Sequence, residues 1–298
     1  MENPNPQPQT ASKWSLERRL QFIDFRLRWE GRLNRRDLIE YFAISVPQAS
    51  MDIAKYSELA PDNLTYDLSS RSYLATPAFR PMYTRSHSRR YLTELWATRN
   101  GLMEPRTSFV GEGISVGFAP APERSIPDSN VHLLVTAIKE KRKILVKYQS
   151  MGSIEPIDRE LSPHALGHDG FRWHTRAYCH TKGRFRDFVI ARMLTIEKGT
   201  VSDLDVSLDR LWHNVITLVI VPNPRLSEAK KRVLELDYGM SNGRVELQCR
   251  QAFLFYTLKR LGLSTKDGGD SPEAQQICLH NRDEIQTFID EALSPGDS

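Results

Sequence analysis

A short stretch of the chain concentrates side chains that bind anions. Residues two apart on a β-strand share a face, so the run from Trp173 to Tyr178 would present His174 and Arg176 together. Arginine forms two parallel hydrogen bonds with a phosphate or a carboxylate, and an aromatic ring can stack on a base. The sequence therefore predicts an anion-binding site with many donors and few acceptors. Its basic members are His164, His174, Arg176, Arg186 and Arg192, and its candidate stacking rings are Tyr148 and Trp173.

Two other interpretations of this stretch stay open. In the first, it is an ordinary strand surface whose arginines pair with Asp158, Glu160 and Asp187. In the second, the carboxylates of Asp158, Glu160 and Asp169 hold a metal for phosphoryl chemistry, and the protein is a nucleic-acid-processing enzyme. Nuclease activity with Mg²⁺ or Mn²⁺ would favour the enzyme.

The sequence predicts no catalytic residue, no resident metal and no cofactor. Cys179 and His180 are adjacent, so on a strand they would point to opposite faces and could not share a metal. No G-x-S-x-G motif indicates a nucleophilic serine. The run Gly111-Glu112-Gly113 has neither the spacing nor the lysine of a phosphate loop.

A helix that begins after residue 45 is a second candidate site. The run Ser45-Val46-Pro47-Gln48 is a capping box with proline near the helix start. Glutamine can bind adenine through two hydrogen bonds, serine can bond to several bases, and nearby basic side chains can neutralise phosphates. We therefore predict DNA contacts from Gln48, Ser50 and Met51 on the helix, with Asp52 beside them, and from Lys55, Arg35, Arg36 and Arg71.

The elements that would position this helix follow the order helix, helix, tight turn, helix, hairpin over residues 14–79. That order is typical of a winged helix-turn-helix. Asn34 is a good cap for the second helix, and Asp37 can bond back to it. The same order would also suit a protein-interaction module that binds no DNA. On the third helix we expect Val46, Ala49, Ile53 and Ala60 to face inward.

The remaining sequence predicts a multidomain α+β protein. Residues 1–13 are polar and are predicted to be a disordered leader. Residues 80–130 are predicted to be a helical linker followed by a connector loop that is rich in glycine and proline. Residues 131–200 contain short strands at roughly ten-residue spacing, which indicate a small, strongly bent sheet or barrel. Residues 201–298 are predicted to form an α+β extension.

Charge is distributed unevenly along the chain. Residues 131–200 carry 13 basic and 7 acidic side chains, a net charge of 13 − 7 = +6, whereas residues 201–298 carry 11 and 15, a net charge of 11 − 15 = −4. The basic part could face a polyanion. No apolar run is long enough to span a membrane, so no membrane association is expected. The three cysteines form no CxxC pair, which fits a reducing cytoplasm.

The block from Arg172 to Arg192 resembles the WYL domain family, which is named for a Trp-Tyr-Leu run on a strand of a small Sm-like β-barrel. Here that run reads Trp173-His174-Thr175, so two of its three letters differ. The Trp-His form is similar to a subgroup associated with bacterial phage-defence operons, the BREX and CBASS regulators. The frame also agrees at Ser150, which the resemblance adds to the ligand-binding residues. The resemblance implies a winged helix, a WYL barrel that senses a nucleotide or nucleic-acid ligand, and a C-terminal extension that dimerises.

Together these observations predict a sequence-specific DNA-binding transcriptional regulator, and more specifically a homodimeric repressor of a phage-defence operon. A single winged helix buries too little surface to bind tightly and selectively alone. A two-fold dimer doubles the contacts and reads a pseudo-palindromic operator in double-stranded DNA. A non-DNA-binding adaptor stays open as a further alternative, and it predicts no mobility shift of the DNA upstream of its own gene.

Overall fold

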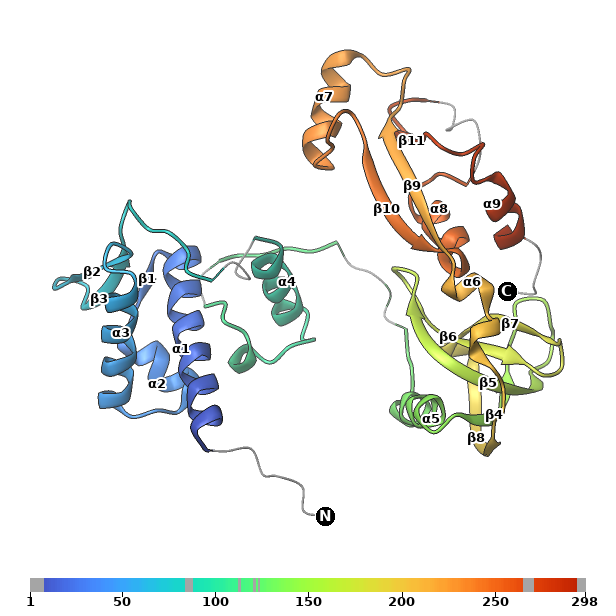
Figure 1. The fold of residues 1–298 in the computed structure, drawn as a ribbon, viewed down its shortest axis with the longest axis horizontal. Coiled ribbons are helices and arrows are strands. Elements are labelled where there is room, and N and C mark those ends of the chain that lie inside the picture. Colours follow the sequence, from blue (N-terminus) through green and yellow to red (C-terminus); the bar gives the residue numbers. More distant parts are fainter. Residues whose placement is uncertain are drawn as a thin grey trace. The chain divides into compact units, whose positions relative to one another are not determined.

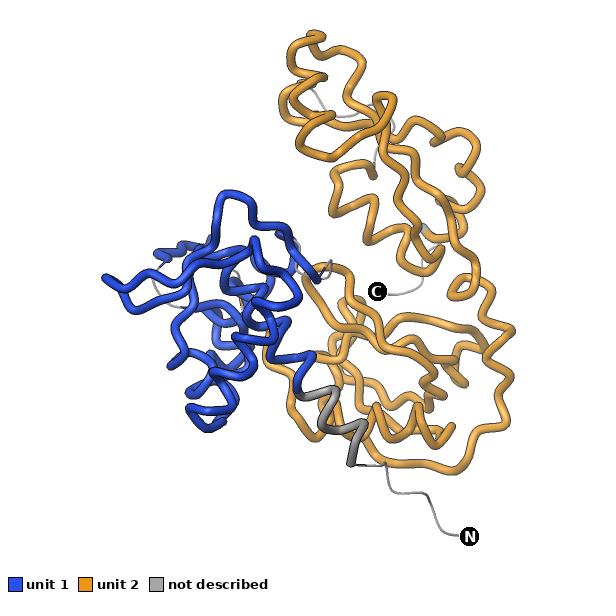
Figure 2. The backbone as a smooth tube through the Cα atoms, turned by 60° about the vertical axis from the view of Figure 1, so that its left-hand side comes forward, with its two compact units in different colours: residues 1–120 blue, residues 121–298 orange. Residues whose placement is uncertain are grey.

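The computed structural model describes residues 8–83, 88–111, 114–119, 122, 124–264 and 271–293. The chain divides into two compact units, residues 1–120 and 121–298 (Figure 2). Three clusters of buried side chains, one in the first unit and two in the second, form the cores. None of the helices in the described ranges is long and apolar enough to cross a membrane.

The first unit contains the predicted winged helix-turn-helix (Figure 1). The carboxylate of Asp37 accepts a bond from the Asn34 backbone N–H, and the Asn34 side chain accepts one from Arg36, which confirms that capping box. A two-residue strand that the sequence did not reveal, β1, pairs with β3 and makes the wing a sheet of order β1-β3-β2. The elements are α1 (Pro8–Glu30), β1 (Arg32–Leu33), α2 (Arg35–Phe42), α3 (Val46–Leu59), β2 (Leu64–Asp67), β3 (Ser72–Ala75), α4 (Ser88–Arg99) and η1 (Pro105–Thr107).

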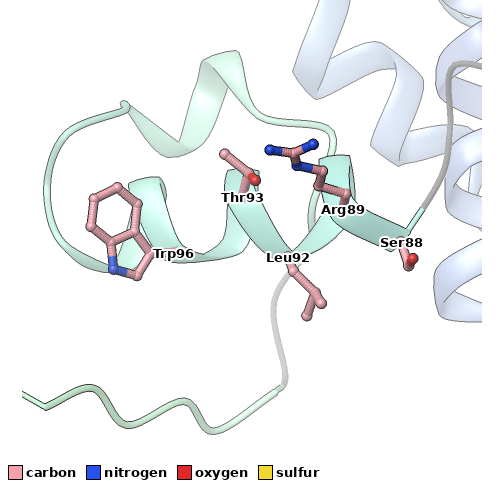
Figure 3. A pocket seen from close by; sticks show the side chains of 5 residues that line it. All are labelled: Ser88, Arg89, Leu92, Thr93 and Trp96. Atoms are coloured by element: carbon pink, nitrogen blue, oxygen red, sulfur yellow. The ribbon is translucent and has the colours of Figure 1, made fainter. Parts of the chain in front are cut away.

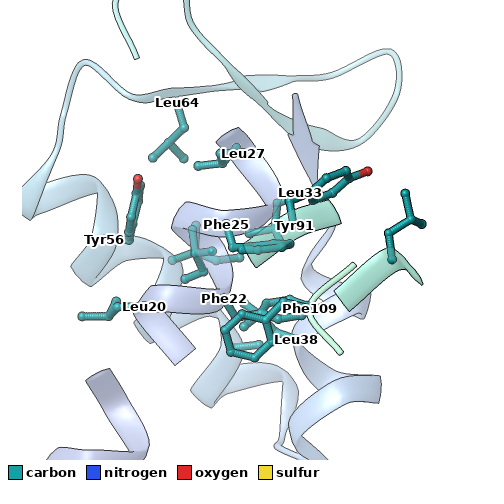
Figure 4. Packing of buried hydrophobic residues seen from close by; sticks show 14 residues of the cluster. Leu20, Phe22, Phe25, Leu27, Leu33, Leu38, Tyr56, Leu64, Tyr91 and Phe109 are labelled. Carbon is teal, nitrogen blue, oxygen red and sulfur yellow. The ribbon is translucent and has the colours of Figure 1, made fainter. Parts of the chain in front are cut away.

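The core of the first unit is built around α1. Phe22 and Phe25 are buried against Phe109, with ring centroids 5.2 and 5.7 Å away in edge-on geometry (Figure 4). Tyr91 of α4 also belongs to this core, and its ring stacks on Trp29 at 5.0 Å. The segment expected to be a linker therefore contributes side chains to the packing of the winged helix.

Two expectations for the first unit need correction. Val46 was predicted to face inward, but 51% of it is exposed, because it stands at the first turn of α3. Ala49 and Ile53 are buried as predicted. The leader was predicted over residues 1–13, yet α1 begins at Pro8. Residues 1–7 lie outside the described residues.

In the second unit, five antiparallel strands form a sheet of order β7-β6-β5-β4-β8. Strands β7 and β8 are its edges, and no pairing joins them within the described ranges. The Sm-like barrel is therefore not confirmed, although the predicted run of short strands is present. The elements are α5 (Asp128–Lys139), β4 (Arg142–Tyr148), β5 (Ile157–His168), β6 (Trp173–Cys179), β7 (Arg184–Val189), η2 (Ile190–Arg192) and β8 (Met193–Val201).

The two faces of this sheet have different neighbours. Directly opposed residues of antiparallel strands share a face. One face carries Val146, Leu161 and Ala177 and is packed by Leu134 of α5, and we call it the α5 face. The other carries His174 and its neighbours and contacts residues 209–256, and we call it the C-terminal face.

The C-terminal part of the second unit contains both helices and strands. Its three-stranded sheet has the order β10-β9-β11, with β9 in the centre. Leu218 of β9 and Leu254 of α8 are fully buried in its core. The elements are η3 (Val206–Leu208), α6 (Arg210–His213), β9 (Val215–Pro222), α7 (Glu228–Asp237), β10 (Val245–Arg250), η4 (Gln251–Phe253), α8 (Leu254–Arg260), β11 (Ile277–Leu279) and α9 (Gln286–Leu293).

A glycine allows the two parts of the second unit to meet closely. A Cβ atom added to Gly167 of β5 would lie 2.0 Å from Cζ of Phe253. The Phe253 ring also lies edge-on to His174, with 6.3 Å between centroids. The Phe253 ring thus occupies the space that a side chain at position 167 would need.

Candidate functional site

The N-terminus of α3 is capped in the predicted way on one side only. The Ser45 hydroxyl accepts a hydrogen bond from the Gln48 backbone N–H at 3.3 Å. The Gln48 side chain does not complete the box; its Nε2 donates instead to Asp52 Oδ1, 2.9 Å away. Asp52 was expected beside the contact residues on the surface, but it is buried and forms an ion pair with Arg19 of α1 at 2.6 Å. A contact between Gln48 and adenine would use the amide nitrogen that now bonds to Asp52.

A buried network holds α3 against α1 and the segment after the wing. Tyr56 donates to Asp24 Oδ1 at 2.7 Å and accepts from Asn63 Nδ2 at 3.0 Å. Asp24 also accepts bonds from the backbone N–H groups of Met82 and Tyr83. Burial, together with the bond to Asp24, raises the pKa of Tyr56 well above its usual value. The network is satisfied, so α3 has a fixed orientation in the unit.

The predicted DNA-contact residues fall on α2, α3 and the wing. On α3, Met51 is 66% exposed, and the Ser50 hydroxyl donates to the Val46 carbonyl at 3.0 Å. Lys55 is exposed and pairs with Glu58 on its own helix at 2.9 Å. Such exposed pairs are weak and break easily in favour of a phosphate.

The basic side chains flanking α3 differ in their surroundings. Arg36 is exposed and pairs with Glu40. Arg35 is half-buried, and its Nε is buried without a hydrogen-bond partner in the described ranges. Arg71 is at the tip of the wing with a φ of 52°, and its carbonyl accepts a bond from the Asn34 side chain. All seven predicted residues thus belong to the winged helix, and contact with DNA stays a prediction.

On the C-terminal face, Arg176 is the centre of a buried ionic cluster. Its Nε and NH2 atoms donate to Asp209 at 2.7 and 2.8 Å, and its NH1 donates to Asp187 at 3.2 Å. His164 Nε2 lies 2.9 Å from the same Asp209 carboxylate. The expectation of few acceptors is therefore wrong here, because two carboxylates already match the donors of Arg176.

His174 continues this cluster toward the C-terminal part. Its Nε2 lies 2.9 Å from Asp169 Oδ2, while its Nδ1 is buried without a partner within the described residues. The ring packs against Tyr256, with centroids 4.9 Å apart. Burial, reinforced by the negative charges of Asp187 and Asp169, raises the pKa of Tyr256.

The pKa values of the carboxylates in this cluster shift in opposite directions. Burial disfavours the charged form of Asp209, but hydrogen bonds from Arg176 and His164 outweigh it and lower its pKa to about 2. Burial also acts on Asp187, where it exceeds the attraction of Arg176 and raises the pKa. The pKa of Asp169 is lowered because bonds from His174 and two backbone N–H groups overcome its burial. The Arg176–Asp209 pair is thus the strongly ionised element of the cluster.

The other predicted ligand residues are not part of this cluster. Arg186 is paired in register with Ala177 and therefore lies on the α5 face, opposite to Arg176. Tyr148 is buried on the same α5 face, and its hydroxyl accepts the Val189 N–H at 3.2 Å. Arg192 lies in η2 and is half-buried.

The last two predicted residues lie near the ends of strands. Ser150 follows β4 and is buried, with its hydroxyl 2.8 Å from that of Ser153. Trp173 begins β6, is 49% exposed, and its ring packs on His168 at 4.8 Å. The eight residues therefore do not converge on one pocket, and ligand binding by them stays a prediction.

Sequence reasoning missed Asp209, the main partner of Arg176. It is 33 positions from Arg176 in the chain and caps the short helix α6 through a bond from Trp212 N–H. A capping aspartate was its sole local signal, and that signal does not indicate an arginine partner.

The three carboxylates considered for metal-assisted chemistry do not converge on a common site. Asp158 lies near Lys147 and Glu160 near Lys143, whereas Asp169 bonds to His174. No group of three or more His, Cys, Asp or Glu side chains suited to a metal occurs in the described ranges.

A shallow hollow lies on the first unit, along α4 (Figure 3). It has a volume of about 440 Å³. Leu92 and Trp96 in its lining are 61% and 45% exposed. The remaining lining residues are Ser88, Arg89 and Thr93.

This fold and these sites define a class of protein, the winged helix-turn-helix proteins that carry a WYL domain. Three family descriptions match successive parts of the chain: the BrxR transcriptional regulator winged helix-turn-helix domain over residues 15–97, the WYL domain over residues 129–198, and the BrxR transcriptional regulator C-terminal dimerization domain over residues 215–285. The chain belongs to the family of CapW transcriptional repressors.

The relatives that establish this membership are similar along nearly their whole length. A protein of Stenotrophomonas maltophilia named DNA-binding transcriptional repressor CapW is 45% identical over 280 residues, 94% of each chain. Proteins of the same name from Escherichia coli (strain KTE188) and Pseudomonas aeruginosa are each 40% identical. The first match covers 94% of this chain and 93% of the relative, and the second covers 97% and 96%.

Proposed function

We propose that this protein is a homodimeric, sequence-specific DNA-binding transcriptional repressor that acts in the cytoplasm and has no enzymatic activity. The observation that carries the proposal is the presentation of α3. That helix is capped at Ser45, and Tyr56 on its buried side is hydrogen-bonded to Asp24 of α1. Its exposed side carries Met51 and Lys55. Membership of the CapW family supports the same function.

Dimerisation follows from the C-terminal part and from the energetics of DNA reading. Residues 215–285 match a family described as a dimerization domain. Two winged helices related by a two-fold axis would read two half-sites of a pseudo-palindrome, which a single winged helix cannot bind with comparable selectivity. Arg35, Arg36 and Arg71 then neutralise phosphates, and Gln48 and Ser50 read base edges.

The regulated gene set and the signal are further parts of the proposal. The resemblance to BREX and CBASS regulators supports a phage-defence operon as the target. A nucleotide or single-stranded nucleic acid bound to the WYL domain would release the repressor, provided that the ligand prefers one of two arrangements of the dimer. The basic balance of residues 131–200 supports a negatively charged ligand.

The test is binding to the DNA immediately upstream of the protein's own gene, measured across a salt series. A specific complex should weaken steeply as salt rises, because phosphate neutralisation releases counterions. A scrambled fragment of equal length and composition is the control. Equal affinity for both fragments at every salt concentration would refute sequence-specific binding, and no binding at low salt would refute the DNA-binding function.

A further inference from the structure

The buried carboxylate of Asp52 determines which way the amide of Gln48 points. Asp52 is 1% exposed, and its Oδ1 atom accepts a hydrogen bond from Gln48 Nε2 at 2.9 Å. A carboxylate can only accept hydrogen bonds, so Gln48 has to turn its nitrogen, and not its carbonyl oxygen, toward Asp52. The polarity of the Gln48 amide is therefore fixed by a neighbour one turn further along α3.

Arg19 of α1 keeps Asp52 in this position. Its Nε donates to Asp52 Oδ2 at 2.6 Å, and its Nη2 donates to Oδ1 at 3.1 Å. Two parallel bonds between an arginine and a carboxylate fix the geometry of both groups. The orientation of Gln48 thus depends on the ion pair that joins α1 to α3, as well as on the Gln48 side chain itself.

Gln48 lies in the part of α3 that meets base edges when a helix-turn-helix binds DNA, the first turn after the cap. Its backbone N–H is bonded to the Ser45 hydroxyl, so its main chain and its side chain are both held. Spacings of three and four place Gln48, Met51 and Lys55 along one stripe of the helix. Gln48 is half-buried, and the other two are exposed. The Gln48 amide therefore stands at the border between the buried and the exposed side of α3.

The oriented amide matches adenine and does not match guanine. After the bond to Asp52, the Gln48 side chain keeps its Oε1 as an acceptor and one N–H as a donor. In the major groove adenine presents the N6 donor and the N7 acceptor, whereas guanine presents two acceptors, O6 and N7. A glutamine without a partner could turn and donate both of its N–H groups to guanine. Gln48 cannot do so while one N–H is bonded to Asp52.

We propose that Asp52, held by Arg19, is a positioning residue that makes Gln48 select adenine over guanine in the major groove. This inference rests on the proposed DNA-binding function. It assigns the preference at one base pair of the operator to a buried carboxylate that touches no DNA.

The test measures the base preference at the pair that Gln48 contacts. In the DNA upstream of the protein's own gene, each A·T pair is replaced by G·C and each G·C pair by A·T, and a mobility-shift assay gives the affinities. The Gln48 pair is the one whose replacement no longer matters in Gln48→Ala. There the unchanged protein should prefer adenine by about 10- to 100-fold.

Asp52→Asn should weaken that preference. The new side-chain amide can donate to Gln48 Oε1, which allows the Gln48 amide to invert, so the preference should fall at least about fivefold. Glu58→Gln is the matched control, because it also removes one carboxylate charge from α3, but from an exposed residue, and it should keep the preference.

A double-mutant cycle separates positioning from a purely structural role. In the Gln48→Ala background, Asp52→Asn should leave the ratio of adenine to guanine affinities unchanged, because Asp52 acts through Gln48. If Asp52→Asn does not fold, the double variant Arg19→Gln and Asp52→Asn removes both charges and leaves no unpaired one. That double variant must then lower the preference in the same way.

The inference would be overturned by an unchanged preference in the folded Asp52 variants, or by a guanine preference at the Gln48 pair. An equal change of the ratio with and without Gln48, or the absence of any pair that depends on Gln48, would overturn it as well. In each of these cases the unchanged protein still binds its DNA specifically, so the proposed function stands. Loss of specific binding by the unchanged protein would refute the proposed function and the inference together.

Discussion

Replacing Asp209 with asparagine removes the charge opposite Arg176 while keeping the shape of the side chain. Asp209 is 1% exposed and accepts two bonds from the guanidinium and one from His164. Its pKa falls from 3.8 to about 2, which corresponds to about 2 kcal/mol of stability. Breaking a buried ion pair costs about 3–5 kcal/mol, and the remaining contact with Asp187 limits the loss. We therefore expect Asp209→Asn to lower the free energy of unfolding of the second unit by about 2–4 kcal/mol at pH 7.

The pH dependence gives this prediction a second check. The pKa of Asp209 is lower in the folded protein than its usual value of 3.8. The stability that its ionised carboxylate contributes is therefore complete at pH values well above 3.8, and it is lost as the pH falls through about 2. The difference between the variant and the unchanged protein should shrink over that interval. Urea unfolding at a series of pH values, followed by tryptophan fluorescence and by circular dichroism, measures the difference. Asp205→Asn is the matched control, because Asp205 is nearby and exposed and should change stability far less.

The reasoning would be refuted by either of two results. If Asp209→Asn lowered the free energy of unfolding at pH 7 by less than about 1 kcal/mol, it would cost no more than an ordinary surface substitution. A loss of full size that does not change between neutral and acidic pH would show that packing, and not charge, is what the substitution removes.

Three further predictions concern the winged helix. Gln48→Ala should weaken binding to the specific upstream site by about 1–3 kcal/mol and leave non-specific binding unchanged; equal losses on specific and scrambled DNA in a mobility-shift assay would contradict base reading. Ser45→Ala should destabilise the protein by about 1 kcal/mol through loss of the cap of α3, and chemical denaturation that detects no change would disprove the capping role. Tyr56→Phe leaves the buried groups of Asp24 and Asn63 without their shared partner and should cost about 1–3 kcal/mol, with an unchanged melting temperature as the contrary result.

Local features of the sequence predicted local features of the fold. The caps at Asn34 and Ser45 depend on contacts within a few residues, and the structure confirms both caps, although the Gln48 side chain does not complete the box at Ser45. The apolar spacing is confirmed at Ala49 and Ile53 but not at Val46. The predicted strands of residues 142–200 follow from alternation and are also present. Closure of the sheet into a barrel depends on how distant strands pair, which alternation does not specify, and the strand order does not confirm it.

The candidate ligand site was harder to predict because it depends on register. Residue types alone placed Arg176 and Arg186 in one cluster, but strands β6 and β7 pair so that these two side chains point to opposite faces. The partner of Arg176 comes from a later part of the chain, beyond the reach of any local pattern.

The missing side chain at Gly167 has a mechanical consequence. Because the Phe253 ring fills that space, the WYL sheet and the helix that follows residue 253 pack against each other through this ring. Sliding of one part over the other would require the ring to leave this space first.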